Sequence, residues 1–170
     1  MTAYVALLRG VNLGKRQLKM ADLKRIGTEL GLSDAKTYIA SGNLLFRSDK
    51  SEASLKKMLE AALHDHMSAK VGVMIRSAKE LAAVTKANPY ADEPGNRVAA
   101  IFLDERAPAG ALDEAKNIAD ERMALGVREI YVHYPSGQGQ SKLRIPAASD
   151  GTARNMNTVA KLAELAQEMT

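Results

Sequence analysis

The chain has 170 residues, 46% of them hydrophobic, and carries 24 basic and 20 acidic side chains. This size and apolar content suffice for one domain, or for two small joined subdomains, with a buried core. No cysteine occurs, which excludes disulfides, thiol nucleophiles and cysteine-ligated metal sites. The net charge of +4 is mild and interspersed with acids, so it favours a solvated surface over a dedicated nucleic-acid interface.

The first apolar run gives no sign of a targeting or membrane segment. It covers residues 4–8 and is broken at Arg9. It therefore lacks the length of a membrane span and the basic flank of a signal peptide. We expect a cytoplasmic protein with no membrane partner.

The first half of the chain alternates strand and helix patterns. Residues 4–9 predict a buried strand, and apolar residues at helical spacing between 20 and 30 predict a helix that ends at Gly31. Two β-prone runs, at 37–40 and 44–46, flank Ser41-Gly42-Asn43, which predicts a hairpin with a turn at 41–43.

Two capping boxes mark the helices that follow. Asp49 with Glu52 predicts the start of an amphipathic helix, which is followed by a strand at 71–75. Ser77 with Glu80 predicts the start of another helix, which ends near residue 88. The order β-α-β-β-α-β predicts an α+β fold of the ferredoxin-like, split β-α-β kind, with helices on one face of an antiparallel sheet.

The second half repeats this order without its last strand, which predicts an internal duplication. Residues 88–97 contain two prolines and a glycine and predict a linker. The first subdomain, with its trailing helix, is then 1–87, and the second, incomplete ferredoxin-like subdomain is 98–170. The patterns in the second predict strands at 98–103, 127–134 and 141–145, a helix with Leu112, Ala115 and Ala119 inward, and a helix at 156–169.

A glycine-containing loop at residues 10–16 lies between a predicted strand and a predicted helix. Backbone amides and a helix N-terminus at such a place can receive an anion. The loop is not a Walker A motif, because Gly10 and Gly14 are one residue too close and Arg16 replaces the metal-binding hydroxyl. The alternative is a loop that needs glycine for its backbone conformation, with solvated cations beside it.

Residues 152–158 combine small polar side chains with one guanidinium, that of Arg154. Thr152, Asn155 or Asn157 would serve as a helix cap, since caps favour these residue types. The functional alternative adds Arg154, because an arginine beside free amides at a helix start is suited to a phosphate or carboxylate.

No pattern predicts a metal site or a catalytic pair. His64 and His66 are two residues apart, so they face different sides of a helix, and His133 is remote. The adjacent acids Asp120 and Glu121 are expected to be solvated rather than to act as an acid and a base on one substrate. The sequence indicates no particular cofactor, and it favours the binding of a small molecule over catalysis.

Four ordered segments resemble the domain of unknown function 1697 (DUF1697) family. They are LRGVNLG at 8–14, MADL at 20–23, TYIASGN at 37–43 and TARNMNT at 152–158, and Ser141-Lys142-Leu143 matches a further family segment. The resemblance implies a small bacterial-type cytosolic protein with ferredoxin-like subdomains, and it implies no particular substrate, cofactor or catalytic residue.

Two departures from the family pattern bear on function. Members often have a second glycine after Gly14, where this chain has Lys15, and often an aromatic residue where it has Met156. The first weakens the case for a glycine loop that binds phosphate. The second removes a surface for stacking.

The leading hypothesis is a cleft for an anionic or nucleotide-like small molecule between the 9–15 loop and the helix start at 152–158. Polar residues gather there although core packing does not require them. The alternatives are an RNA-binding module, although the aromatic-rich RNP1 pattern is missing, and a structural or oligomeric interaction module. The predicted ligand-binding residues are Arg9, Asn12, Lys15, Ser41, Asn43, Lys142, Arg154, Asn155 and Asn157.

Overall fold

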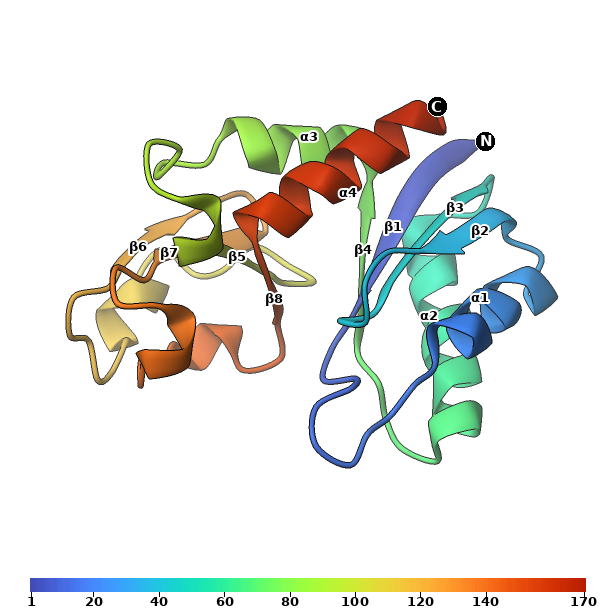
Figure 1. Cartoon of the computed structure of the whole chain (residues 1–170), viewed down its shortest axis with the longest axis horizontal. Coiled ribbons are helices and arrows are strands. Elements are labelled where there is room, and N and C mark those ends of the chain that lie inside the picture. The colour runs from blue at the N-terminus through green and yellow to red at the C-terminus, as the bar shows by residue number, and fades with distance from the viewer. The chain divides into compact units, whose positions relative to one another are not determined.

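The computed structural model describes residues 1–170 and contains two compact units (Figure 1). The first unit comprises Met1–Leu81 together with Leu162–Thr170, and the second comprises Ala82–Lys161. The chain passes between the units within two helices, α3 (Ala78–Lys86) and α4 (Met156–Glu168). Residues 88–97 lie inside the second unit. No helix is long and apolar enough to span a bilayer.

The first unit contains a four-stranded antiparallel sheet in the order β2-β3-β1-β4. Its central strand, β1, pairs with β3 on one side and with β4 on the other (Figure 1). The α+β class and the split β-α-β order are as predicted. The elements are β1 (Thr2–Leu8), α1 (Met20–Glu29), β2 (Ser33–Thr37), β3 (Asn43–Ser48), α2 (Glu52–Met67) and β4 (Val73–Ser77).

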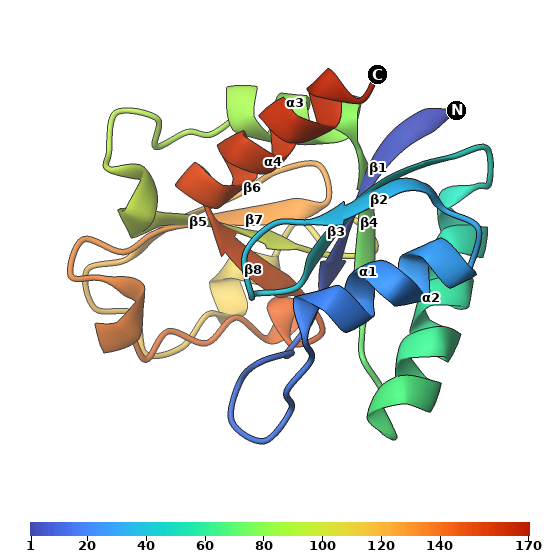
Figure 2. The ribbon, with the colours of Figure 1, turned by 45° about the vertical axis from the view of Figure 1, so that its right-hand side comes forward.

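The core of this unit lies between the sheet and the helices α1 and α2, which cover the same face (Figure 2). Because side chains alternate along a strand, Ala6 and its register partners Leu44 and Ile75 all point to this face. All three are at most 1% exposed. Leu59 of α2 is also fully buried there, and burying a leucine side chain contributes roughly 1.5–3 kcal/mol.

The opposite face of the same sheet is buried as well. Val5 is paired with Leu45 and with Arg76 in register, and Leu7 is paired with Met74. These five side chains are between 0 and 3% exposed. A sheet that binds RNA presents exposed aromatic rings for stacking, so this sheet does not form such a platform.

The second unit contains another antiparallel sheet, in the order β6-β7-β5-β8. The two sheets have the same strand order, since β5 to β8 take the places of β1 to β4. β8 is followed by α4, as β4 is followed by α3. This shared order is what an internal duplication predicts, but the second sheet is not incomplete as predicted, because β8 occupies the place of the last strand. The strands are β5 (Val98–Phe102), β6 (Arg122–Leu125), β7 (Glu129–His133) and β8 (Thr152–Asn155).

The prediction of a helix around Leu112 and Ala115 is wrong. Only a short 3-10 turn, Ala111–Glu114, forms there. The chain then becomes extended, because Lys116 exchanges both backbone hydrogen bonds with Arg144, at 2.8 and 2.9 Å. The predicted strand at 141–145 is reduced to this single bridge. Pairing with a distant segment therefore overrides the helical spacing.

Several predicted boundaries shift. The predicted strand at 37–40 lies instead at Ser33–Thr37, and residues 38–42 form the connection, with φ of +51° at Ile39 and +90° at Gly42. The helix predicted to be capped by Asp49 is capped by the Ser51 hydroxyl, which accepts from Ser54 N–H at 3.2 Å.

The second capping box is confirmed. Ser77 N–H donates to Glu80 Oε1 at 2.9 Å, and Glu80 N–H donates to the Ser77 hydroxyl at 3.1 Å. Helix α3 follows at Ala78, as predicted.

Candidate functional site

Three loops of the first unit meet at one end of its sheet. Because β1 is antiparallel to β3 and β4, the end of β1 adjoins the starts of the other two strands. Leu8 N–H donates to the Gly42 carbonyl at 2.9 Å, and Arg9 N–H donates to the Gly72 carbonyl at 2.8 Å. We call the loops 9–19, 38–42 and 68–72 together the three-loop end. The first of them extends beyond the sheet in Figures 1 and 2.

Asn12 fastens two of these loops together. Its side-chain amide donates to the Leu18 carbonyl at 3.0 Å and to the Ala40 carbonyl at 2.6 Å. Its side-chain oxygen accepts from Leu18 N–H at 2.7 Å. The two N–H donors and one oxygen acceptor are thus engaged with the backbone. Asn12, predicted as a ligand-binding residue, positions the loops.

Asn43 is fully buried at the start of β3. Its side-chain amide donates to the Tyr38 carbonyl at 2.9 Å and to the Ser41 hydroxyl at 3.0 Å. These bonds close the connection 38–42 and orient Ser41, which is partly exposed. Asn43 therefore shapes the site from beneath, and Ser41 is the one of the pair that reaches its surface.

Gly42 permits the close approach of the loops. A Cβ added there would lie 2.6 Å from Val11 Cγ2 and 3.0 Å from Leu8 Cβ, and φ is +90°. Both the space and the backbone conformation require glycine. The geometry of this turn thus depends on Gly42, which the hairpin prediction had already placed in the turn.

The three-loop end is strongly basic. The three loops contain no aspartate or glutamate, and all their cationic side chains are exposed. Asp22 is the first acidic residue after the 9–19 loop, and its carboxylate lies 3.7 Å from both Arg25 and His66. Clustered cations without acids among them raise the local potential and attract anions. The cations are Arg9, Lys15, Arg16, Lys19 and Lys70.

Two large apolar side chains are exposed on the same loops. Leu13 is 71% exposed and Ile39 is 48% exposed. They belong to the loops that the bond from Asn12 to Ala40 joins. The three-loop end therefore combines positive charge with apolar surface.

Arg154 lies in the second unit, and the structure corrects its expected environment. Residues 152–155 form strand β8 rather than the start of a helix, and Arg154 pairs with Ala100 of β5. Its guanidinium donates to the Thr152 hydroxyl at 2.7 Å and to the Ala153 carbonyl at 2.9 Å. It is 6% exposed, and burial lowers its pKa to about 10, so it stays charged at neutral pH.

The remaining residues of the 152–158 segment serve the helix start at Met156. Asn155 Oδ1 accepts from Thr158 N–H at 2.9 Å, so the capping alternative is confirmed for Asn155. Asn157 is exposed and lies against Gly95, where an added Cβ would clash with its Oδ1. The predicted cleft that joins this segment to the 9–15 loop stays a prediction.

A sequence comparison decides the family. The profile described as "Protein of unknown function (DUF1697)" matches residues 1–131. The chain belongs to this family. This DUF1697 chain is similar in structure to a conserved bacterial protein from Streptococcus pneumoniae, with a TM-score of 0.82 and 28% sequence identity. The match covers 98% of this chain and 99% of the other. No curated protein matches the sequence.

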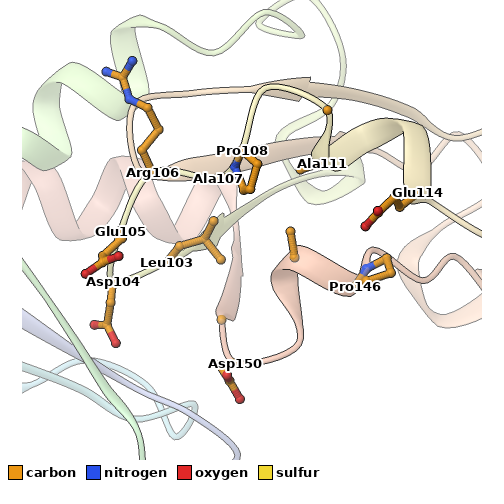
Figure 3. Close-up of a pocket in the computed structure, with 13 residues that line it drawn as sticks. Leu103, Asp104, Glu105, Arg106, Ala107, Pro108, Ala111, Glu114, Pro146 and Asp150 are labelled. Carbon is orange, nitrogen blue, oxygen red and sulfur yellow. The ribbon is translucent and has the colours of Figure 1, made fainter.

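A cavity of about 760 Å³ lies in the second unit of this DUF1697 protein (Figure 3). Leu103 lies on its apolar side, and acidic residues line it elsewhere. In Figure 3 the guanidinium of Arg106 points away from the side on which Asp104 and Asp150 lie. Its acids disfavour an anionic ligand, and none of the predicted ligand-binding residues lines it. The acids are Asp104, Glu105, Glu114 and Asp150.

The second cavity of the DUF1697 chain holds about 610 Å³, and predicted residue Lys142 lines it. Glu121, expected to be solvated, is only 7% exposed there. Its carboxylate accepts from Ala119 N–H at 2.7 Å and from the Ser141 hydroxyl. These donors hold the pKa of the Glu121 carboxyl below its usual range. The family segment at Ser141 was the signal in the sequence that pointed to this place.

Proposed function

We propose that the three-loop end of the first unit binds a phosphate-bearing, nucleotide-like small molecule. The observation that carries the proposal is the charge of three hydrogen-bonded loops, which contribute five exposed cations and no carboxylate. Arg9, Lys15 and Ser41 of the predicted set contact the ligand. Arg16, Lys19 and Lys70 extend that set.

Charge alone gives such a site little affinity unless several contacts act together. One exposed ion pair contributes roughly 0.2–1 kcal/mol. A multiply charged phosphate ligand meets several cations at once, and an arginine can hold two of its oxygens. The contacts made by Asn12 and Asn43 fix the loops before binding, which lowers the entropic cost of forming them.

The exposed apolar side chains favour a nucleotide over inorganic phosphate. Leu13 and Ile39 provide apolar contact for a base or another flat ring beside the phosphate-binding cations. The proposal does not require the second-unit residues Lys142, Arg154 and Asn157. The participation of these three residues in the same site stays a prediction.

Calorimetry with ATP, pyrophosphate and adenosine tests the proposal. ATP and pyrophosphate are expected to bind at low salt, ATP more tightly, and adenosine alone is expected not to bind measurably. The variant Lys15→Ala/Arg16→Ala should weaken ATP binding about tenfold, which corresponds to about 1.4 kcal/mol.

The matched control is Lys24→Ala/Lys57→Ala, which removes the same charge from exposed positions on α1 and α2. It should keep ATP affinity within about twofold, since only local charge differs. Equal losses in the two double variants would show that general charge, rather than the three-loop end, governs binding, and would overturn the proposal.

A further inference from the structure

The cavity of the second unit that Lys142 lines has the properties of a separate binding site. Its volume of about 610 Å³ falls in the range of small-molecule pockets, and all its lining residues belong to the second unit. Tyr134, Glu121, Asp120 and Lys142 supply its polar wall, and Ile118, which is 51% exposed, supplies apolar surface. The proposed function of the three-loop end uses none of these residues.

Tyr134 is the strongest sign that a ligand belongs there. The residue is 8% exposed and lines the cavity, yet its hydroxyl makes no hydrogen bond within the chain. The hydroxyl oxygen is not among the fully buried polar atoms that lack a partner, so it is reached from the cavity and is free to donate to a bound molecule. Burial, with a smaller effect from Glu121, raises the pKa of Tyr134, so the hydroxyl keeps its proton as a donor. A bound molecule that accepts from this hydroxyl would satisfy it.

Hydrogen bonds hold the two carboxylates of the cavity, and neither carboxylate has an ionic partner. Asp120 accepts from the Ser136 hydroxyl at 2.6 Å, and Glu121 accepts from Ser141 and from Ala119 N–H. Neither carboxylate forms an ion pair, and the Lys142 ammonium forms none either. Unpaired charges beside a cavity are available to complementary charges on a ligand.

We propose that this cavity binds a small zwitterion of the α-amino-acid class. The ligand's ammonium group faces Asp120 and Glu121, its carboxylate faces Lys142, and its side chain lies against Ile118. The Tyr134 hydroxyl donates to the ligand carboxylate. An anion without an ammonium group meets two carboxylates and one cation, and an amine without a carboxylate leaves Lys142 and Tyr134 unsatisfied, so each binds more weakly.

Three probes that share one carbon skeleton test the charge requirement on the full chain. They are L-leucine, 4-methylpentanoate, which lacks the ammonium group, and 3-methylbutylamine, which lacks the carboxylate. In an NMR titration to about 10 mM, leucine should give saturable shifts at residues 117–121 and 134–142, and each analogue should bind at least about tenfold more weakly. L-glutamate and L-lysine extend the test to other side chains.

Two variants test the residues. Tyr134→Phe should leave the melting temperature unchanged or higher, because the hydroxyl has no partner in the fold, and should weaken leucine binding about fivefold. Lys142→Met should weaken leucine binding while leaving 3-methylbutylamine binding unchanged. The control, Lys86→Met, removes an exposed charge outside the cavity and should bind leucine as the unmodified chain does.

Three results would each overturn the proposal. They are the absence of saturable shifts with all three amino acids, equal affinity for leucine and its analogues, and undiminished leucine binding by the Tyr134→Phe variant.

Discussion

The side chain of Asn12 donates a hydrogen bond to the Ala40 carbonyl, 28 residues along the chain, at 2.6 Å. This bond joins the loop after β1 to the connection before β3. It places Leu13, Lys15 and Arg16 beside a turn that would otherwise be independent of them. Such contacts make the three-loop end one surface, and substitutions of the residues that form them test this.

Replacing Asn12 with alanine is expected to destabilise the protein by about 2–3 kcal/mol. The substitution removes three side-chain hydrogen bonds and places alanine at a φ of +58°, which asparagine tolerates better. Urea unfolding measures the change. Asn96→Ala, at an exposed position, should change the free energy of unfolding by at most about 0.5 kcal/mol. Similar effects of the two substitutions would contradict the role given to Asn12.

Two glycine substitutions separate steric clash from backbone strain. Gly42→Ala places a methyl group 2.6 Å from Val11 Cγ2 at a φ of +90°, and should cost about 3 kcal/mol or more. Gly14→Ala, at a φ of +61° with no atom within 4 Å, should cost only about 1–2 kcal/mol from backbone strain. Thermal or urea unfolding compares them. A greater loss from Gly14→Ala would refute the packing described around Gly42.

Arg154→Ala is expected to destabilise the fold by about 2–3 kcal/mol, since it removes a buried group that several hydrogen bonds hold. An exposed arginine at a helix start, as the sequence had suggested, would contribute about 1 kcal/mol or less. Arg106→Ala is the exposed comparison within the same unit. An Arg154→Ala protein as stable as Arg106→Ala would speak against the burial of Arg154.

The Tyr131 hydroxyl donates to the Val84 carbonyl at 2.8 Å, and burial, with a smaller effect from Glu129, raises its pKa to about 12. The ordinary value is about 10, so the folded state keeps this proton longer than the unfolded state. Its contribution to stability is therefore fully present below about pH 10 and is lost as the pH rises toward about 12. Compared with Tyr131→Phe, the native chain should be more stable by about 1 kcal/mol at neutral pH. Urea unfolding of both proteins should show this advantage shrinking above about pH 10, and a constant advantage would contradict the assignment.

Nucleic-acid binding is expected to be weak. The net charge of +4 is small, and both faces of the first sheet are buried, so neither charge nor stacking supports tight binding. Fluorescence anisotropy with single-stranded and duplex oligonucleotides should detect binding only at low salt, with loss near about 150 mM. Sequence-selective binding that survives at that concentration would favour the RNA-binding alternative.

Local signals in the sequence predicted the first unit well. Continuous apolar runs in β1 and β3 and the reciprocal bonds of Ser77 and Glu80 depend on neighbours close in the chain. Such patterns are readable without knowledge of distant contacts.

Contacts between distant segments account for the errors. Residues around Lys116 have helical spacing, but their backbone bonds go to Arg144, and Arg154 pairs with Ala100 of β5. Glu121 is buried because Ser141, 20 residues later, donates to it. The charge of the three-loop end could be read from the sequence only in part, because Lys70 joins it through the register of β4 with β1.

The measurement that tests the central claim most directly is chemical-shift mapping of the full chain during titration with ATP at about 50 mM salt, where screening of exposed charges is still moderate. We expect saturable shifts concentrated at residues 9–19, 38–42 and 68–72, and the Lys15→Ala/Arg16→Ala variant should need about tenfold more ATP to reach the same shifts. Shifts centred on other residues, or a titration that leaves these three loops unchanged, would contradict the claim that the three-loop end is the phosphate-binding site.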